Sequence, residues 1–257
     1  MRGIRTRSVE PVTARSSTAG NTTAMLTLLY DVHGNLPALE AVLADAGEQG
    51  ASEYFIGGDV ALFGPWPKDT VRRLRELEPA TWIRGNGERW TADPDSAPEP
   101  VRGATAAARE ALGDAMVDEL NALPQSSPIG ADGTTRAWHG SPVSDVRSFF
   151  PEPAEDEEEL LADVTERRLI FGHTHLPFRR TSSLGGVELV NPGSVGMPFD
   201  GDHRAAYALL APDGTIEHRR VAYDHVAPVA ALRDRYGDAS WTTGPIYRLT
   251  HARPESS

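Results

Sequence analysis

Polar side chains that can bind metal ions recur in this sequence where apolar segments end. The apolar segment 25–30 reads as a buried strand, and Asp31 and His33 follow it directly. Two residues apart in an extended segment, these side chains would share one face. A carboxylate and an imidazole on one face can begin a metal site, although the pair alone fits an ordinary strand-end turn better.

The same arrangement returns further along the chain. Asp59 and Asn86 each follow a short apolar segment and have glycines beside them. His139 ends a later segment, and His173 and His175 end another. Each alone has a structural explanation, because Gly, Asn and Asp make turns and a lone histidine is usually structural. Together with the first pair, these oxygen and nitrogen ligands favour a metal centre.

Alternating strand and helix patterns predict how these ligands are brought together. Apolar residues at helical spacing predict helices over 37–50 and 68–77, between strands at 25–30, 54–56 and 81–83. This order predicts parallel strands joined by crossover helices. The carboxyl ends of such strands lie at the edge where open α/β sheets place their sites. We therefore expect the ligands to meet at that edge.

Later segments predict further elements around the sheet. A helical pattern over 102–123 is interrupted at Gly113 and predicts two short helices, and we expect the segment 91–124 to form a helical cap. Turn signals predict one hairpin around Asp132-Gly133 and another around 212–214.

The chain is expected to form a single domain over 25–250. Residues 1–24 are rich in Arg, Ser and Thr, and we expect either a disordered leader or a mis-assigned start there. The segment 251–257 is expected to be a loose tail. The acidic run 155–159 is interpreted as a solvated helix start, since acids favour a helix N-terminus.

Composition limits the function classes. The 257-residue chain has a formal net charge of −12, which argues against general nucleic-acid binding. Bound cations can reverse the local potential, so a phosphate substrate is still compatible. The chain has no cysteine, which excludes disulfides and thiolate ligands and fits a cytoplasmic protein. No apolar run approaches the roughly 20 residues that span a bilayer, so we expect no membrane association.

The motifs taken together resemble the calcineurin-like metallophosphoesterase superfamily. The fuller first and last motifs resemble its small prokaryotic YfcE-like phosphodiesterase group. The resemblance covers roughly residues 26 to 200. The motifs are Asp31-Val32-His33-Gly34-Asn35, Gly58-Asp59, Gly85-Asn86, His139-Gly140-Ser141-Pro142, Gly172-His173-Thr174-His175 and Asn191-Pro192-Gly193-Ser194-Val195.

The resemblance implies a four-layer α/β/β/α sandwich of two mixed β-sheets and a site for two divalent metal ions. It assigns one metal to Asp31, His33 and His175, the other to Asn86, His139 and His173, and a bridging role to Asp59. A carboxylate has two oxygens and a negative charge, so it can link two cations. Imidazole and amide ligands suit Mn, Fe, Zn, Ni or Co, and the sequence leaves the metal's identity open.

The resemblance further implies a metal-dependent phosphoesterase in which a hydroxide between the two metals attacks a small phosphate ester. No side-chain nucleophile is needed, and turn geometry explains Ser141 better than catalysis does. We expect a phosphodiesterase. A Ser/Thr or small-molecule phosphomonoesterase and a non-catalytic scaffold of the same fold are the alternatives, and the oligomeric state is open.

One position departs from the family pattern. Many relatives carry a histidine directly after the motif asparagine, where it can protonate the leaving group, and this chain has Gly87 there. Neither Glu88 nor Arg89 replaces that histidine by spacing, so we expect a preference for good leaving groups or another acid. Asn35, Asn86 and Gly87 are expected near the substrate phosphate.

Overall fold

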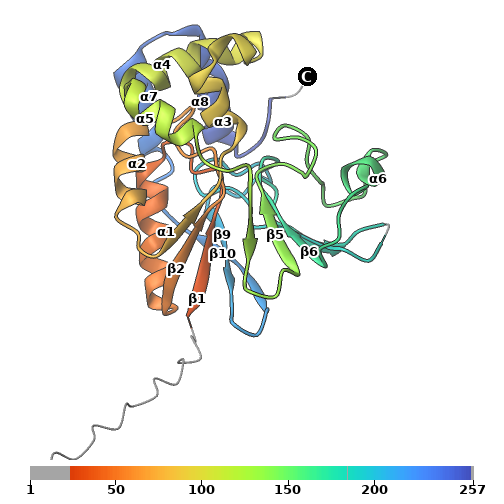
Figure 1. Cartoon of the computed structure of the whole chain (residues 1–257). Helices are drawn as coiled ribbons and strands as arrows, with labels where there is room; N and C mark the ends of the chain where they lie inside the picture. Colours follow the sequence, from red (N-terminus) through yellow and green to blue (C-terminus); the bar gives the residue numbers. More distant parts are fainter. Residues whose placement is uncertain (1–23, 184, 256–257) are drawn as a thin grey trace, which may run out of the picture.

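Two five-stranded mixed β-sheets pack face to face in the computed structural model, which describes residues 24–183 and 185–255 (Figure 1). The first sheet has the order β10-β9-β1-β2-β3. Its strands β1, β2 and β3 are parallel, and β9 and β10 add to it by antiparallel pairing. The bounds are β1 Met25–Leu29, β2 Ala51–Ile56, β3 Ala80–Trp82, β9 Ala205–Leu210 and β10 Ile216–Val221.

The second sheet repeats this design with the order β4-β5-β6-β8-β7. Its three inner strands, β5, β6 and β8, are parallel, and both edge strands are antiparallel to their neighbours. The predicted pair of mixed sheets is therefore confirmed, although the sequence patterns had not indicated β7. The bounds are β4 Ser126–Ile129, β5 Thr135–Trp138, β6 Arg168–Ile170, β7 Phe178–Thr181 and β8 Glu188–Asn191.

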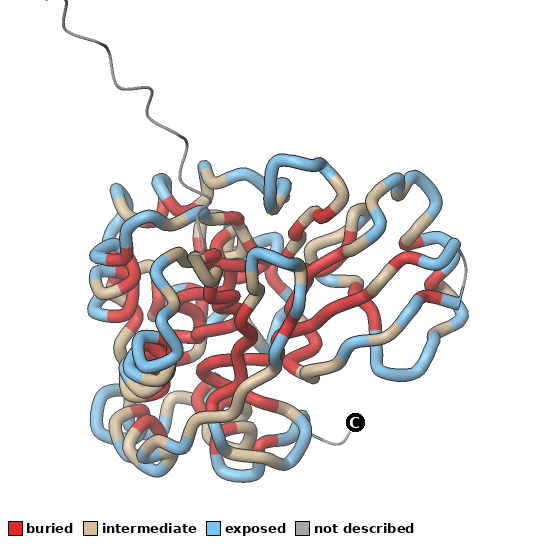
Figure 2. The backbone as a smooth tube through the Cα atoms, turned by 90° about the horizontal axis from the view of Figure 1, so that it is seen from below, coloured by how far each residue is buried: buried red, intermediate tan, exposed pale blue. Residues whose placement is uncertain are grey.

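Strand β1 is buried on both faces because each sheet has a layer on either side. Leu29 packs in the cluster that includes the apolar stripes of α1 (Leu36–Glu48) and α2 (Pro67–Arg75). The preceding residue, Leu28, points to the opposite face and packs with Ile170 and Val190 of the second sheet. This alternation follows from the two-residue period of a strand. Figure 2 shows the buried backbone running through the middle of the molecule.

The outer face of the second sheet carries a thin fourth layer. Within the described residues, the helix in this layer is α6, which spans only Glu157–Leu160. Loops cover the rest of the apolar face, which includes Phe171 and Leu189. The interpretation of the acidic run as solvated is wrong for Glu157, which is 2% exposed. Its carboxylate pairs with Arg180 of β7, because a buried charge needs a partner, and also accepts from the Ser183 backbone N–H at 2.7 Å.

Helices gather above the carboxyl ends of the first sheet's strands (Figure 1). The expected division at Gly113 is confirmed, since the residue has a φ of +81° between α4 and α5. Helix α3 was not predicted, because its first turn lies within a motif interpreted as a turn. The bounds are α3 Asn86–Ala92, η1 Pro94–Ser96, η2 Glu99–Val101, α4 Arg102–Leu112 and α5 Asp114–Asn121.

The C-terminal part returns to the same end of the molecule. It forms α7 (Ala227–Tyr236), η3 (Ser240–Thr242) and α8 (Thr243–His251), and Ala252 after α8 is buried. The expected leader lies, apart from Ala24, outside the described residues. Among the described helices, each is too short or too polar to cross a membrane.

Candidate metal centre

The structure brings all seven predicted ligands together at the carboxyl ends of five parallel strands. The first sheet supplies four of them, after β1, β2 and β3, and the second sheet supplies three, after β5 and β6. Six are at least 95% buried, and His173 is half-buried. The seven are Asp31, His33, Asp59, Asn86, His139, His173 and His175.

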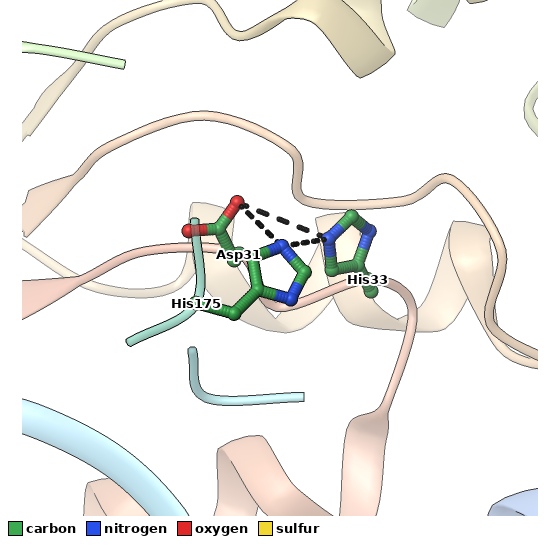
Figure 3. A group of neighbouring side chains, drawn as sticks. All are labelled: Asp31, His33 and His175. Carbon is green, nitrogen blue, oxygen red and sulfur yellow. Dashed lines mark hydrogen bonds and ion pairs between the residues drawn. The ribbon is translucent and has the colours of Figure 1, made fainter. Parts of the chain in front are cut away.

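Asp31, His33 and His175 form one cluster, drawn in Figure 3. The Asp31 Oδ1 atom lies 3.3 Å from His175 Nε2 and 3.8 Å from His33 Nε2. Each histidine uses its other nitrogen to donate to a backbone carbonyl: His33 Nδ1 lies 2.9 Å from Leu62 O and His175 Nδ1 lies 2.6 Å from Met197 O. These bonds fix the tautomer that leaves both Nε2 lone pairs facing the cluster.

This first cluster fits a cation. The two Nε2 atoms lie 3.1 Å apart, and with both Nδ1 atoms donating, their lone pairs face each other. The Asp31 Oδ1 atom is buried without a hydrogen-bond partner. Buried polar atoms are normally satisfied, so converging acceptors without donors require a positive charge among them.

The second cluster joins Asp59, Asn86, His139 and His173. His139 Nδ1 lies 2.8 Å from Gly57 O, and its Nε2 lies 3.0 Å from Asn86 Oδ1 and 3.4 Å from Asp59 Oδ1. The position of Asn86 Oδ1 is also 2.9 Å from His173 Nδ1. An amide oxygen cannot form a hydrogen bond with these acceptors. Either a cation lies between the oxygen and the acceptors, or the Asn86 amide is turned so that its nitrogen faces them.

The two carboxylates lie between the clusters. Asp59 Oδ1 faces His139, while Asp59 Oδ2 lies 4.0 Å from His33 Nε2, so its two oxygens face different clusters. Asp31 Oδ1 also approaches the second cluster, at 3.9 Å from His139 Nε2. The arrangement is therefore two adjoining clusters of possible ligands, with carboxylate oxygens lying between them.

Burial sets the charge states in the absence of a cation. It lowers the pKa of His33 to about 3 and that of His173 to about 4, so both rings are neutral at neutral pH and can coordinate. Burial raises the pKa of Asp59 to about 7, with Glu88 and Asp31 adding to the effect of burial and His139 opposing it. Against the effect of burial, Asp59 and Asp31 raise the pKa of His139, so this ring is the histidine that answers the buried carboxylates, and bound divalent cations would supply further positive charge.

The backbone at these positions is strained. Five of the seven residues have a left-handed φ between +48° and +68°: Asp31, His33, Asp59, His173 and His175. This region is uncommon for residues other than glycine, and such outliers gather at functional sites. The premise of an extended segment is therefore wrong, since Asp31 and His33 meet through a sharp turn. His173 and His175 diverge, one into each cluster.

Glu88 fixes two of the ligand-bearing loops. Its buried carboxylate accepts from the backbone N–H groups of Gly85 at 2.8 Å, Asp59 at 2.9 Å and Val60 at 2.9 Å. Sequence reasoning considered Glu88 only as a replacement for a histidine and missed this role. The available signal was its place three residues after Gly85, where an acid closes the N-terminus of α3.

The motif 191–195 also supports the ligand loops. Ser194 Oγ donates to the Asp31 carbonyl at 2.7 Å, and Asn191 Nδ2 donates to Thr174 Oγ1 at 2.9 Å. Asn35 accepts from Ala38 N as the cap of α1 and donates to Gly196 O at 2.8 Å, so its amide is engaged within the fold.

The structure shows the contacts of Ser141 and Gly87, two further positions considered in the sequence. Ser141 Oγ donates to the Ser144 carbonyl at 3.2 Å within a turn, in keeping with the structural interpretation. Gly87 donates its N–H to Asp59 Oδ1 at 2.6 Å, and a Cβ atom on Gly87 would lie 2.9 Å from that same oxygen. A side chain at position 87 would therefore displace the Asp59 carboxylate.

Comparison with known proteins gives a consistent family match. The family model described as the calcineurin-like phosphoesterase superfamily domain matches residues 25–214. An uncharacterized protein of Methanocaldococcus jannaschii is 28% identical over 223 residues, which cover 78% of this chain and 88% of that protein. Phosphodiesterase YfcE of Escherichia coli is 28% identical over 201 residues, covering 74% of this chain and 89% of that enzyme.

Solved structures share the fold over most of the chain. A metallophosphoesterase from Sphaerobacter thermophilus superposes with a TM-score of 0.74 at 27% identity, covering 89% of this chain and 99% of that one. A Pyrococcus horikoshii protein superposes with a TM-score of 0.73 at 21% identity, covering 86% of this chain and 96% of that one. All seven predicted ligands lie within the range matched by the family model, whereas α7 and α8 lie beyond it.

Proposed function

Because the chain belongs to the calcineurin-like phosphoesterase superfamily, we propose that it is a metal-dependent phosphodiesterase acting on a small phosphate ester. The observation that carries this proposal is the convergence of buried acceptors on a space without donors, with Asp59 between two clusters. The name of the phosphodiesterase relative supports the choice of diester over monoester.

We assign one divalent cation to Asp31, His33 and His175 and the second to Asn86, His139 and His173, with Asp59 shared. When bound, two such cations lower the pKa of a water and neutralise charge on phosphate oxygens. The chain's own contribution is to hold the imidazole lone pairs in place, through the bonds from Nδ1 to backbone carbonyls. Nitrogen and oxygen ligands suit Mn, Fe, Zn, Ni or Co.

Position 87 sets a limit on the leaving group. Gly87 brings no side chain, and its N–H is engaged by Asp59, so this position offers no acid to the departing oxygen. Esters whose alcohols leave readily without protonation are therefore the expected substrates. We expect p-nitrophenyl and aryl diesters to be hydrolysed faster than alkyl diesters.

The experiment that tests the proposal compares bis(p-nitrophenyl) phosphate with p-nitrophenyl phosphate. Protein stripped of metal is supplied in turn with Mn, Ni, Co, Zn or Mg, and initial rates are measured. We expect turnover that depends on the metal and prefers the diester. Asp59→Asn serves as the control, because removing the shared carboxylate charge should abolish the metal-dependent rate.

The other outcomes favour different functions. A preference for the monoester would replace the phosphodiesterase with a phosphomonoesterase. Two bound ions without turnover of either ester would favour a non-catalytic scaffold.

A further inference from the structure

The guanidinium group of Arg248 is a cation without a polar partner among the described residues. Arg248 lies on α8, half-buried, and its Nε atom is buried with no hydrogen-bond partner. Glu255 attracts it electrostatically, but the two form no ion pair. Burial lowers the pKa of Arg248, although an arginine stays charged at neutral pH. A partly desolvated, unpaired charge is costly unless something else binds it.

The side chain of Phe63 lies between Arg248 and the candidate metal centre. The guanidinium carbon lies 5.5 Å from the ring centre of Phe63, a cation–π contact. The Phe63 ring centre lies 5.6 Å from that of His33. Phe63 has a φ of +77°, which is an outlier for a bulky side chain. The fold therefore accepts backbone strain at the residue that lies between the cation and the metal cluster.

Helix α8 is held firmly at this rim. Its Leu249 is buried in a cluster with Met197, and Phe63 and Phe199 pack against that cluster. Phe199 in turn stacks on His175, with ring centres 4.2 Å apart. Arg248 is thus presented by a packed element, and the Phe63 ring lies between it and His33.

A neighbouring arginine shows what a structural role looks like here. Arg235 of α7 donates from Nη1 to the Pro65 carbonyl at 2.9 Å and so ties α7 to the loop that carries Phe63. Arg248 makes no such bond, although it contacts the same loop. Its Nε atom is buried, but Nη1 and Nη2 are not buried and form no hydrogen bond within the described residues. These two groups are therefore open to an outside acceptor, and phosphate oxygens suit them.

We propose that Arg248 binds a second phosphate group of the substrate, beyond the one that is hydrolysed, and so selects diesters that carry an additional anion. The inference rests on the proposed phosphodiesterase function and deepens it. In a chain with a net charge of −12, a local cation near the candidate metal centre would favour binding of a second phosphate. Because α8 lies outside the matched range 25–214, this selectivity would belong to the C-terminal helices rather than to the shared domain.

The test uses two diesters with the same leaving group. Thymidine 5′-(p-nitrophenyl phosphate) is compared with its 3′-phosphorylated derivative, which adds one phosphate and leaves the reacting centre unchanged. We expect kcat/KM to be about tenfold higher for the 3′-phosphorylated diester, mainly through KM, as one charge-assisted contact provides. In Arg248→Gln this preference should vanish, while turnover of bis(p-nitrophenyl) phosphate stays within about twofold.

Matched variants separate binding from general charge and from folding. Arg233→Gln removes the same charge from an exposed position on α7 and should keep the preference. Arg248→Lys retains the charge without the planar fork and should keep about a threefold preference. If Arg248→Gln does not fold, this drop from about tenfold to about threefold in Arg248→Lys tests the proposal instead. Thermal unfolding of each variant checks the fold.

The proposal is overturned if the wild-type protein shows no preference, if Arg248→Gln keeps it, or if that variant loses both diesters and bis(p-nitrophenyl) phosphate equally. If the wild type hydrolyses no diester with any metal, the proposed function fails instead. Calorimetry then still tests Arg248, because thymidine 3′,5′-bisphosphate should bind more tightly than thymidine 5′-monophosphate to the wild type and equally to Arg248→Gln.

Discussion

At the scale of single residues, three of the candidate histidine ligands are each held by a bond that leaves the coordinating nitrogen free. His33, His139 and His175 all donate from Nδ1 to a backbone carbonyl and present Nε2 to the centre. The orientation thus depends on loop backbone rather than on other side chains. Loss of one histidine should therefore leave its neighbours in place.

Removing the His175 imidazole should weaken one metal site selectively. We expect His175→Ala to lose about one of two bound ions and at least about a hundredfold in activity, because it removes a direct ligand. Metal content by elemental analysis and the rate on bis(p-nitrophenyl) phosphate measure both. His225→Ala is the control, and full metal content with full activity in His175→Ala would require a different ligand set.

A side chain at position 87 should disturb the Asp59 carboxylate of this chain. In Gly87→Ala the added Cβ would lie 2.9 Å from Asp59 Oδ1, so the shared carboxylate must move. We expect metal affinity to fall roughly tenfold to a hundredfold, as for other changes that misplace a ligand. Titration with Mn or Zn measures this. Gly47→Ala is the matched control, since its Cβ meets nothing within 4 Å near the C-terminal end of α1. Unchanged affinity in Gly87→Ala would show that the carboxylate adapts freely.

At the scale of elements, the first turn of α3 links two ligand-bearing loops. Glu88 lies on that turn and accepts backbone N–H groups from the loops after β2 and β3. Asp59 and Asn86 therefore depend on the position of one helix. The helix begins at Asn86 itself, so its N-terminus and the metal centre are parts of the same structure.

Replacing the Glu88 carboxylate should loosen both loops together. In Glu88→Gln an amide nitrogen would face a backbone N–H, so at least one buried bond is lost. We expect a loss of about 1–3 kcal/mol in the free energy of unfolding and weaker metal binding, measured by urea unfolding and metal titration. Glu110→Gln, at an exposed position on α4, is the control. Equal metal affinity in Glu88→Gln and the wild type would argue against the positioning role.

Helix α1 is tied to the first sheet through Asp45. Its carboxylate accepts from Arg219 at 2.7 and 3.0 Å and from the Tyr207 hydroxyl at 2.5 Å. The bond from Arg219 lowers the pKa of Asp45, with Tyr207 adding to it and burial opposing it. Because the folded pKa is below the unfolded value near 3.9, this stabilisation is complete at neutral pH and is lost as pH falls through the folded pKa.

Asp45→Asn should therefore be destabilising in a way that depends on pH. We expect a loss of about 1–2 kcal/mol at pH 7 that shrinks as the pH falls below about 4. Urea unfolding at pH 7 and pH 3.5 measures the difference between variant and wild type. A difference that does not change with pH would show that the charge of Asp45 contributes little.

At the scale of the whole molecule, the candidate centre joins the two sheets. Asp31, Asp59 and Asn86 come from the first sheet, and His139 and His175 come from the second. Bound cations would therefore cross-link the sandwich at one end, in addition to the apolar contacts between the sheets. Metal binding and folding stability should be coupled.

Removing metal should lower the melting temperature. A ligand at about a hundred times its Kd stabilises by about 2.7 kcal/mol, and for a domain of this size that corresponds to roughly 5–10 °C. Thermal unfolding with and without a chelator measures the shift. Asp59→Asn should show little change on chelation, and an equal shift in that variant would mean that the stabilising ions bind elsewhere.

The sequence by itself determined which seven side chains are candidate ligands and the sheet edge at which they gather. Asp31, Asp59 and His139 follow apolar segments, and parallel strands bring their carboxyl ends to one edge whatever the details of packing. The division at Gly113 was predictable because local patterns reflect local structure, whereas the two mixed sheets were expected from the family resemblance.

Only the tertiary structure decided the features that depend on distant contacts. The family resemblance assigned His173 and His175 to different metals, but no residue pattern announces the left-handed turns that separate them. Glu157 is buried because Arg180 reaches it from another strand, although an acidic run alone indicates a solvated surface. Arg248 comes to lie beside Phe63 and the metal centre through packing of α8 against a loop far away in the sequence, and such a contact leaves no local periodicity to read.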